Sequence, residues 1–389
     1  MKLLVIVSRD YGELGNAMNF LERTPLATAP VLMLPVGMQE PGLAAGAFDI
    51  RRYESLNEIQ ASVRETEPDA VLLFSGYLLA IGRRFSLLHA LQLLRFLRAR
   101  GTPVLTSDPF IGMIRSPWSL DFSVVLASQP GMGRGLRRAS IALMSKALSL
   151  RIYLMRRALR GACHVYPAPI EEPAAGGRTL QLNYFNPDLA RASQSQAALA
   201  PGKPLWVFTL SRVDCLIQTR RHGSAFIEHL AARLSEVAAS GRQAVLVATP
   251  ELAAQLRPKL AEGADVILRG EESYSRYMAT LMAAEYAFFW NYFSFSIIHR
   301  VIAGRPVFFF DEGHMVEILP ALSQQGIRSF YGGWRPPLRR LSDPLQPASL
   351  AVDALDVRRE FAAITARLTT GMAPIPLVQL ARERHAASE

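Results

Sequence analysis

Two arginines in the second half of the chain have the spacing and surroundings of a phosphate-binding site. Arg212 follows an apolar run that ends at Leu210, and Arg221 lies in the basic cluster Arg220-Arg221-His222-Gly223, ahead of an amphipathic stretch. A guanidinium can bind two phosphate oxygens at once, so these two cations predict a site for a diphosphate. Solvated surface arginines are the alternative interpretation of the same residues.

A second polar group follows an aromatic run further along the chain. Residues 286–290 and 306–310 are apolar and of strand length, as expected for parallel strands that are buried on both faces. Ligands of open α/β sheets bind where a strand leads into the next helix, and the N-terminus of a helix favours anions. Asn291, Ser294 and Ser296 are therefore candidates for a phosphate or ribose site. The alternative is that the two serines only cap the helix.

A glycine turn between these two groups is a candidate nucleobase site. Leu268-Arg269-Gly270 ends an apolar stretch, and a helix is expected from Ser273. Gly270 has no side chain, so a ligand can approach its backbone closely. The carboxylates that follow, Glu271 and Glu272, fit equally well as residues that favour the N-terminus of that helix.

Polar residues also follow the expected strands of the first half, and they predict the acceptor side of a site. Gly12 and Gly15 come after the first strand, where a helix is expected to begin, and allow close backbone approach, although they do not form a GxGxxG motif. Ser75 and Tyr77 follow a later strand. A tight structural turn is the alternative for the two glycines.

One carboxylate in this half is placed to act as a base. Asp108 follows the strand expected to end near Thr106. A general base must reach the acceptor hydroxyl from that side, so Asp108 is the predicted catalytic residue. An Asx turn ahead of Pro109 is the competing interpretation.

Apolar runs alternate with amphipathic stretches along the whole chain, which is the pattern of doubly wound α/β domains. We therefore predict an α/β protein with two Rossmann-like domains facing a central cleft. The expected strands of the first half are Leu3–Ser8, Val31–Leu34, Ala70–Phe74, Pro103–Thr106 and Ala162–Tyr166. Those of the second half are Pro204–Leu210, Gln243–Ala248, Asp265–Leu268, Tyr286–Trp290 and Pro306–Phe310.

Composition narrows the class of protein. The chain has 389 residues, is 50% hydrophobic and carries a formal charge of +10, so it can bury a sizeable core while its surface attracts polyanions. The opening residues contain too few apolar side chains for a signal peptide, and no run reaches transmembrane length without charges. Cys163 and Cys215 lie far apart without CxxC spacing, which indicates neither a metal framework nor a disulfide. These features predict a cytoplasmic protein.

The positive charge is concentrated in residues 131–161, which contain no carboxylate. At about 100° per residue, a basic arc that includes Arg138 and Lys146 lies opposite an apolar stripe. The stripe consists of Ile141, Met144, Leu148, Ile152, Met155 and Leu159. Such a helix suits an anionic membrane surface, and an ordinary surface helix is the alternative. No recognition helix or zinc finger is present in the sequence, so nucleic acid is not an expected partner.

These motifs together resemble the second domain of GT-B glycosyltransferases, in particular the retaining class that uses nucleoside-diphosphate sugars. In that class a strand-end arginine and a later Lys-Gly bind the donor diphosphate, and Ser211-Arg212-Val213 and Arg221-His222-Gly223 occur here in that order. Leu268-Arg269-Gly270 is similar to its turn before the base-binding loop. Residues 299–307 are similar to its closing Glu-Ala-hydrophobic-Ala-x-Gly-x-Pro-Val.

The chain departs from this class at two positions. The class carries two glutamates, and here Asn291 and His299 stand at the matching positions. Amide and imidazole groups offer mixed donors and acceptors, whereas a carboxylate only accepts. A protonated His299 would suit a phosphate, and packing within a helix core is the alternative. The resemblance implies a metal-independent reaction with no cofactor, in which the nucleotide-sugar is a substrate.

The resemblance also implies a domain organisation and a function. We expect an acceptor-binding domain at 1–170, a linker at 171–203, a nucleotide-sugar-binding domain at 204–345 and a C-terminal helix and tail at 346–389. The expected activity is that of a hexosyltransferase-type enzyme of polysaccharide biosynthesis, with a lipid-linked or cell-envelope glycan acceptor at the inner membrane face. Catalytically inactive GT-B-like binding or assembly proteins are the alternative, and the same fold also hosts nucleotide-sugar epimerases.

Overall fold

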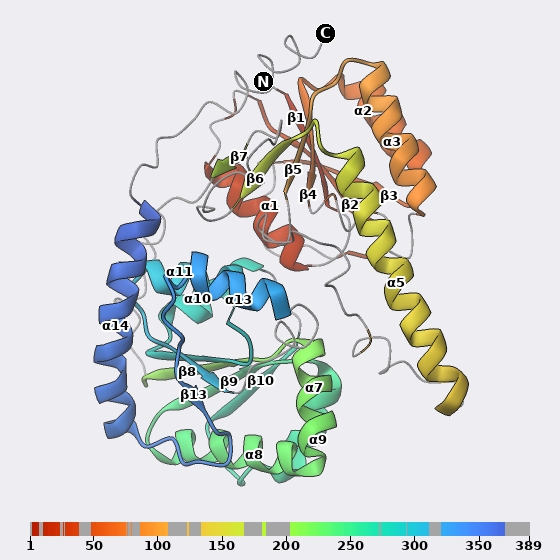
Figure 1. Cartoon of the computed structure of the whole chain (residues 1–389). Coiled ribbons are helices and arrows are strands. Elements are labelled where there is room, and N and C mark those ends of the chain that lie inside the picture. Colours follow the sequence, from red (N-terminus) through yellow and green to blue (C-terminus); the bar gives the residue numbers. More distant parts are fainter. Residues whose placement is uncertain are drawn as a thin grey trace. The chain divides into compact units, whose positions relative to one another are not determined.

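The chain divides into two compact units, each built around its own sheet (Figure 1). The first comprises Met1–Leu120, Leu143–Phe185 and Gly371–Glu389, and the second comprises Asp121–Ala142 and Asn186–Thr370. The computed structural model describes residues 2–7, 11–23, 26, 28–38, 48–74, 76, 79, 86–107, 123, 134–166, 181–183, 203–270, 272, 274–292, 294–310 and 320–369.

Within the described residues, seven parallel strands form the first sheet, in the order β3-β2-β1-β4-β5-β6-β7. They are β1 (Leu3–Val7), β2 (Val31–Pro35), β3 (Asp49–Tyr53), β4 (Ala70–Phe74), β5 (Val104–Ser107), β6 (Cys163–Tyr166) and β7 (Gln181–Asn183). All five side chains of β1 are buried, because helices cover both faces of the sheet. Figure 1 shows α1 (Tyr11–Arg23) on one face, with α2 (Leu56–Thr66), α3 (Leu87–Ala99) and α5 (Arg134–Ala158) on the other.

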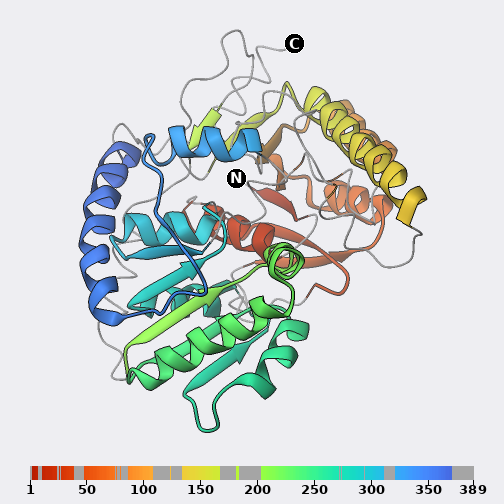
Figure 2. The same cartoon turned by 60° about the horizontal axis from the view of Figure 1, so that its bottom comes forward.

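In the part of the second unit that the structure describes, six parallel strands form the sheet, in the order β10-β9-β8-β11-β12-β13. They are β8 (Leu205–Thr209), β9 (Gln243–Val247), β10 (Val266–Arg269), β11 (Tyr286–Phe289), β12 (Val307–Phe310) and β13 (Leu338–Arg339). The helices are α7 (Arg212–His222), α8 (Ser224–Ala239), α9 (Pro250–Leu256), α10 (Tyr274–Ala283), α11 (Phe295–Ile302), α13 (Pro320–Ser329) and α14 (Pro347–Thr369), and a 3₁₀ turn covers Arg257–Lys259. In Figure 1, α8 lies on one side of the sheet and α10 and α11 on the other, and Figure 2 brings α8 to the front.

Both sheets place their first strand between the second and fourth strands in chain order, which is the Rossmann arrangement. The prediction of two Rossmann-like domains is therefore confirmed. In each sheet the strand order reverses beside the first strand. For the second sheet, this topological switch point lies between β8 and β11.

A row of aromatic rings holds the centre of the second sheet together. Phe208 stacks on Phe288 with ring centroids 4.6 Å apart, and Phe288 stacks on Phe310 at 5.5 Å. Phe226 of α8 meets Trp290 edge to face at 6.3 Å. Each fully buried ring contributes about 1.5–3 kcal/mol relative to exposure. The strands that carry the switch point are thus fixed by a rigid aromatic core.

The structure differs from the predicted domain boundaries in two places. β7 pairs with β6 and belongs to the first sheet, although residues 171–203 were expected to be linker. α14 belongs to the second unit rather than to a separate C-terminal segment, since Thr365 donates a hydrogen bond to the Val301 carbonyl and Phe361 packs against Trp334. The sequence signal was weak because the polar edge strand β7 has only three residues and lacks an apolar run.

Candidate functional site

The carboxyl ends of β8 and β11 form the candidate site, because ligands of doubly wound sheets bind at the switch point. Each strand leads directly into a helix whose N-terminus carries a serine cap. Ser211 accepts a hydrogen bond from the Asp214 backbone N–H at the start of α7. Ser294 does the same for the Ile297 N–H at the start of α11. Two helix N-termini, both favourable for an anion, therefore begin at neighbouring strand ends.

A buried carboxylate connects these two strand ends. Asp214 is 0% exposed, and its Oδ2 accepts hydrogen bonds from the Ser211 hydroxyl at 2.6 Å and from the Asn291 amide at 3.1 Å. Asn291 is itself 8% exposed. A buried carboxylate is stable only when its oxygens are hydrogen-bonded, so Asp214 holds the β8–α7 turn and the β11–α11 turn together. The Ser-x-x-Asp spacing of a helix start was the sequence signal that could have identified Asp214.

On the same edge, hydroxyl groups form a chain across the sheet. The Tyr277 hydroxyl of α10 donates to Ser296 Oγ at 3.1 Å and lies 3.4 Å from Thr209 Oγ1. Ser296 Oγ is 2.6 Å from Ser294 Oγ. Burial raises the pKa of Tyr277, so its hydroxyl keeps its proton and serves as a donor. The chain links the end of β8 to the N-terminus of α11.

The predicted residues Ser294, Ser296 and Asn291 therefore come together at one strand edge. Sequence reasoning missed Tyr277 and Thr209, which complete the group. Thr209 ends β8 and Tyr277 lies within α10, on a helix that carries no motif.

His299 lies deeper in α11 than a phosphate-binding role would suggest. It is 8% exposed and stands five residues after the Ser294 cap, about 7 Å along the helix axis. The next residue, Arg300, is 0% exposed and donates to four backbone carbonyls, those of Leu281, Ala284, Glu285 and Pro306. Burial, followed by the charge of Arg305, lowers the pKa of Arg300 to about 9. This arginine fixes α11 to the starts of β11 and β12.

The structure separates the two arginines that were expected to share a diphosphate. Arg212 is exposed at the first position of α7, at the switch point. Arg221 is in the last turn of the same helix, about 13 Å further along the axis. Arg221 was expected at the start of a helix, but it lies near the end of one, because Ser211 caps a helix that begins at Arg212. Arg221 therefore cannot bind the same phosphate as Arg212.

The charge of Arg212 acts on a carboxylate that follows the neighbouring strand β9. Its charge contributes to a lowered pKa of Glu251 at the start of α9, after the larger effects of hydrogen bonds from the Glu251 backbone and the Thr249 side chain. The two charges are therefore close enough to interact across the ends of β8 and β9.

Gly270 follows β10 with an unstrained backbone. Its φ is outside the positive region, and a Cβ at this position would meet only the Pro250 side chain, at 3.8 Å. In the same loop, Glu272 forms ion pairs with Arg269 at 3.6 Å and Arg276 at 3.4 Å, while its Oε1 is buried without a hydrogen-bond partner. The fold alone therefore does not require glycine at position 270.

The residues predicted in the first half of the chain differ in whether the structure describes them. Gly12 and Gly15 lie at the start of α1, which begins at Tyr11, so the expectation that they follow the first strand and open a helix is confirmed. Their role on the acceptor side stays a prediction. Ser75, Tyr77 and Asp108 lie outside the residues that the structure describes.

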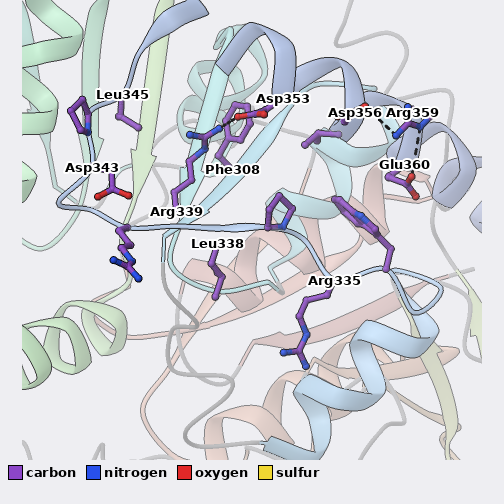
Figure 3. Close-up of a pocket in the computed structure, with 15 residues that line it drawn as sticks. Phe308, Arg335, Leu338, Arg339, Asp343, Leu345, Asp353, Asp356, Arg359 and Glu360 are labelled. Carbon is purple, nitrogen blue, oxygen red and sulfur yellow. Dashed lines mark hydrogen bonds and ion pairs between the residues drawn. The ribbon is translucent and has the colours of Figure 1, made fainter. Parts of the chain in front are cut away.

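A pocket of about 620 Å³ lies elsewhere in the second unit, between β13 and α14 (Figure 3). Its lining includes Phe308 and Trp334, with four arginines and four carboxylates. Arg339 points at Asp353 and forms an ion pair with it, and Arg359 pairs with Asp356 at 3.1 Å (Figure 3). Two of the four arginines are thus already paired with carboxylates of the lining. Within the described residues, no group of three or more His, Cys, Asp and Glu is arranged to hold a metal ion.

Comparisons with known proteins identify the fold. No family model matches the sequence, and no curated protein matches it. Among solved structures, Os79 from O. sativa in complex with UDP is similar with a TM-score of 0.58 at 12% identity, covering 100% of both chains. Phytolacca americana UGT2 with UDP-2fluoro-glucose and pterostilbene has a TM-score of 0.53 at 10% identity, covering 100% of this chain and 99% of that one. UDP-GlcNAc 2-epimerase from Neisseria meningitidis bound to UDP-GlcNAc has a TM-score of 0.53 at 10% identity, covering 100% of both. The chain has the two Rossmann-like domains of the GT-B fold.

Proposed function

We propose that this protein is a glycosyltransferase that transfers a hexose-type sugar from a nucleotide-sugar donor to a lipid-linked or cell-envelope glycan. The observation that carries this proposal is the switch point of the second sheet, where two capped helix N-termini, a hydroxyl chain and an exposed arginine meet. Solved structures with this fold hold UDP or UDP-sugars. The reaction takes place in the cytoplasm, at the inner membrane face.

Each residue of this edge has a part in donor binding. Arg212 neutralises the leaving diphosphate, and the N–H groups at the start of α11 donate to its oxygens. Ser294 and Ser296 add hydroxyl donors, and the Gly270 backbone lies against the base. Charge neutralisation by an arginine and a helix dipole requires no metal ion.

Asn291 and His299 replace the two glutamates of the retaining class that the sequence resembles. In this proposal Asn291 is a positioning residue, because its amide is hydrogen-bonded to Asp214. His299 forms a hydrogen bond with the sugar of the nucleotide-sugar from its position within α11. Asp108 is the general base, and Gly12, Gly15, Ser75 and Tyr77 belong to the acceptor side. Arg221 is not included because of its distance from Arg212.

An epimerase is the second candidate, because the Neisseria enzyme is as similar in fold as the transferase from Phytolacca. The two activities differ in product. An epimerase incubated with a nucleotide-sugar alone inverts one centre of the sugar and leaves it attached to the nucleotide. A transferase gives free nucleotide and, with acceptor present, a glycoside. A binding protein that lacks activity gives neither product while still binding the nucleotide.

Nucleotide binding is the direct test. We expect UDP, or another nucleoside diphosphate in a panel that includes CMP, to raise the melting temperature, since a ligand at 100 times its Kd stabilises by about 2.7 kcal/mol. Arg212→Ala should weaken binding about tenfold or more, because a charge-assisted hydrogen bond contributes about 1.5–3 kcal/mol. Arg257→Ala, an exposed arginine of the 3₁₀ turn, is the matched control and should not change it.

A second variant tests the base site without disturbing the fold. Gly270→Ala has room for its methyl group, so its melting temperature without ligand should equal that of the wild type. If the base lies against this backbone, nucleotide affinity falls. The proposal is refuted if no nucleotide in the panel shifts the melting temperature, or if Arg212→Ala binds as tightly as the Arg257→Ala control.

A further inference from the structure

The long helix α5 has two apolar faces, and only one of them belongs to the protein core. Ile152, Met155 and Leu159 are 1%, 0% and 1% exposed, and Met155 and Leu159 join the cluster built on β1, β2 and β4. These residues form half of the stripe that the sequence analysis assigned to a membrane. That assignment was wrong for this half, because the first sheet already buries these side chains.

The opposite face carries a second stripe. Leu143, Ala147, Leu150 and Leu154 are spaced by four, three and four residues, which places them within an arc of about 60° on a helix. Leu143 is 73% exposed and Leu150 is 43% exposed, while Leu154 is half-buried. All four lie in the part of α5 that belongs to the first unit. The outward stripe, as we name these four residues, therefore faces solvent.

Basic residues border the outward stripe on both sides. By helical spacing, Lys146 and Arg157 lie along one border and Arg151 along the other, and all three are exposed. No carboxylate occurs between Arg134 and Arg160. A narrow apolar stripe between cations is the arrangement of helices that lie in the surface of an anionic bilayer. A second copy of the same helix would bring like charges together, which disfavours self-association through this face.

We infer that the outward stripe is a docking surface for an anionic lipid bilayer, with Leu143 and Leu150 inserted among the acyl chains and Lys146, Arg151 and Arg157 at the headgroups. Long basic side chains can keep their charges in water while their stems cover apolar surface. Within the described residues, no helix is long and apolar enough to cross a bilayer. Docking through this surface would bring the protein to the lipid-linked acceptor of the proposed function. The test of the docking surface does not depend on that function.

Vesicle flotation tests the assignment. We expect the full chain to float with vesicles of phosphatidylcholine and phosphatidylglycerol, to bind vesicles of phosphatidylcholine alone much more weakly, and to dissociate as salt is raised. Leu143→Ser combined with Leu150→Ser should lower binding by about tenfold per leucine. Lys146→Gln combined with Arg151→Gln should lower it by about fivefold per cation.

A matched control comes from α14. Val352 and Leu355 are each 64% exposed, but their helix carries carboxylates among its basic residues. Val352→Ser combined with Leu355→Ser should float like the wild type. Three results would overturn the assignment. They are an equal loss of vesicle binding in this control, wild-type vesicle binding by the Leu143/Leu150 variant, and equal flotation of the protein with neutral and anionic vesicles.

Two further measurements separate the remaining outcomes. If a second copy of this chain covers the outward stripe, the wild type is a dimer in lipid-free solution and the Leu143/Leu150 variant is a monomer. That result also overturns the assignment. The nucleotide-induced melting shift is measured on the same variants. If no nucleotide shifts the wild type, the proposed function fails while the flotation result still decides the docking surface.

Discussion

The hydrogen bond between Asn291 and Asp214 offers a sharp test of how the candidate site is held together. In Asn291→Asp the shape of the side chain is kept, but the amide that donates to Asp214 at 3.1 Å becomes a second carboxylate. Loss of a hydrogen bond to a charged group costs about 1.5–3 kcal/mol. Two buried carboxylates at this distance cannot both ionise, so one retains its proton well above its usual pKa.

The pH dependence of this variant has a definite sign. Its folded state binds a proton that the unfolded state releases, so its free energy of unfolding falls as the pH rises through the ordinary carboxyl range. We expect a loss of about 3 kcal/mol relative to the wild type at pH 7.5, with recovery of about 1.4 kcal/mol per pH unit as the medium is acidified below the raised pKa. Urea denaturation at pH 7.5 and pH 5 measures both values.

Two companions complete the experiment. Asn291→Ala removes the donor without adding a charge, so it should lose about 1–3 kcal/mol with the same pH dependence as the wild type. Asp214→Asn combined with Asn291→Asp exchanges the two groups and should recover at least half of the loss. Equal losses for Asn291→Asp and Asn291→Ala at both pH values would refute an ionised Asp214 at this position.

Two stability predictions concern the first unit. Gly76→Ala should lower the free energy of unfolding by about 1–3 kcal/mol, because a Cβ would lie 2.4 Å from Thr106 Oγ1. Gly161→Ala is the control and should be neutral, because its Cβ meets nothing within 4 Å. Equal denaturation midpoints for the two variants would contradict this packing. Burial lowers the pKa of His164 to about 4, and the charge of Arg156 adds to the effect. The unfolded chain therefore binds a proton more readily than the folded one. The free energy of unfolding of the wild type should fall by about 2 kcal/mol from pH 7.5 to pH 5. His164→Gln should lack this loss in denaturation curves, and an unchanged pH dependence would refute the assignment.

The buried strands could be predicted from the sequence because each is a continuous apolar run. β1, β4 and β11 read directly as strands, since both of their faces are covered. The edge strand β3, with the sequence Asp-Ile-Arg-Arg-Tyr, exposes most of its side chains and lacks that signal. The edge strands β3, β7 and β13 were therefore missed, whereas the edge strand β10, which is more apolar, was predicted.

The candidate site was predicted only in part, for a related reason. Ser294 and Ser296 were identified because they follow a strand and precede a helix. Asp214 and Tyr277 acquire their role from partners far away in the sequence, at separations of 77 residues to Asn291 and 68 residues to Thr209. Helix α7 was missed because its apolar residues form no clear stripe, so Arg221 was placed at a helix start rather than at a helix end.

The carbonyl contacts of Arg300 have a consequence for engineering the candidate site. They fix the rotation and depth of α11 through a residue near its end, on the sheet side and away from the Ser294 cap. Replacing Ser294 or Ser296 removes the cap or the bond to Tyr277, while the contacts of Arg300 still hold the far end of the helix. A library that varies those two positions while keeping Arg300 would change the candidate site while the far end of α11 keeps its contacts.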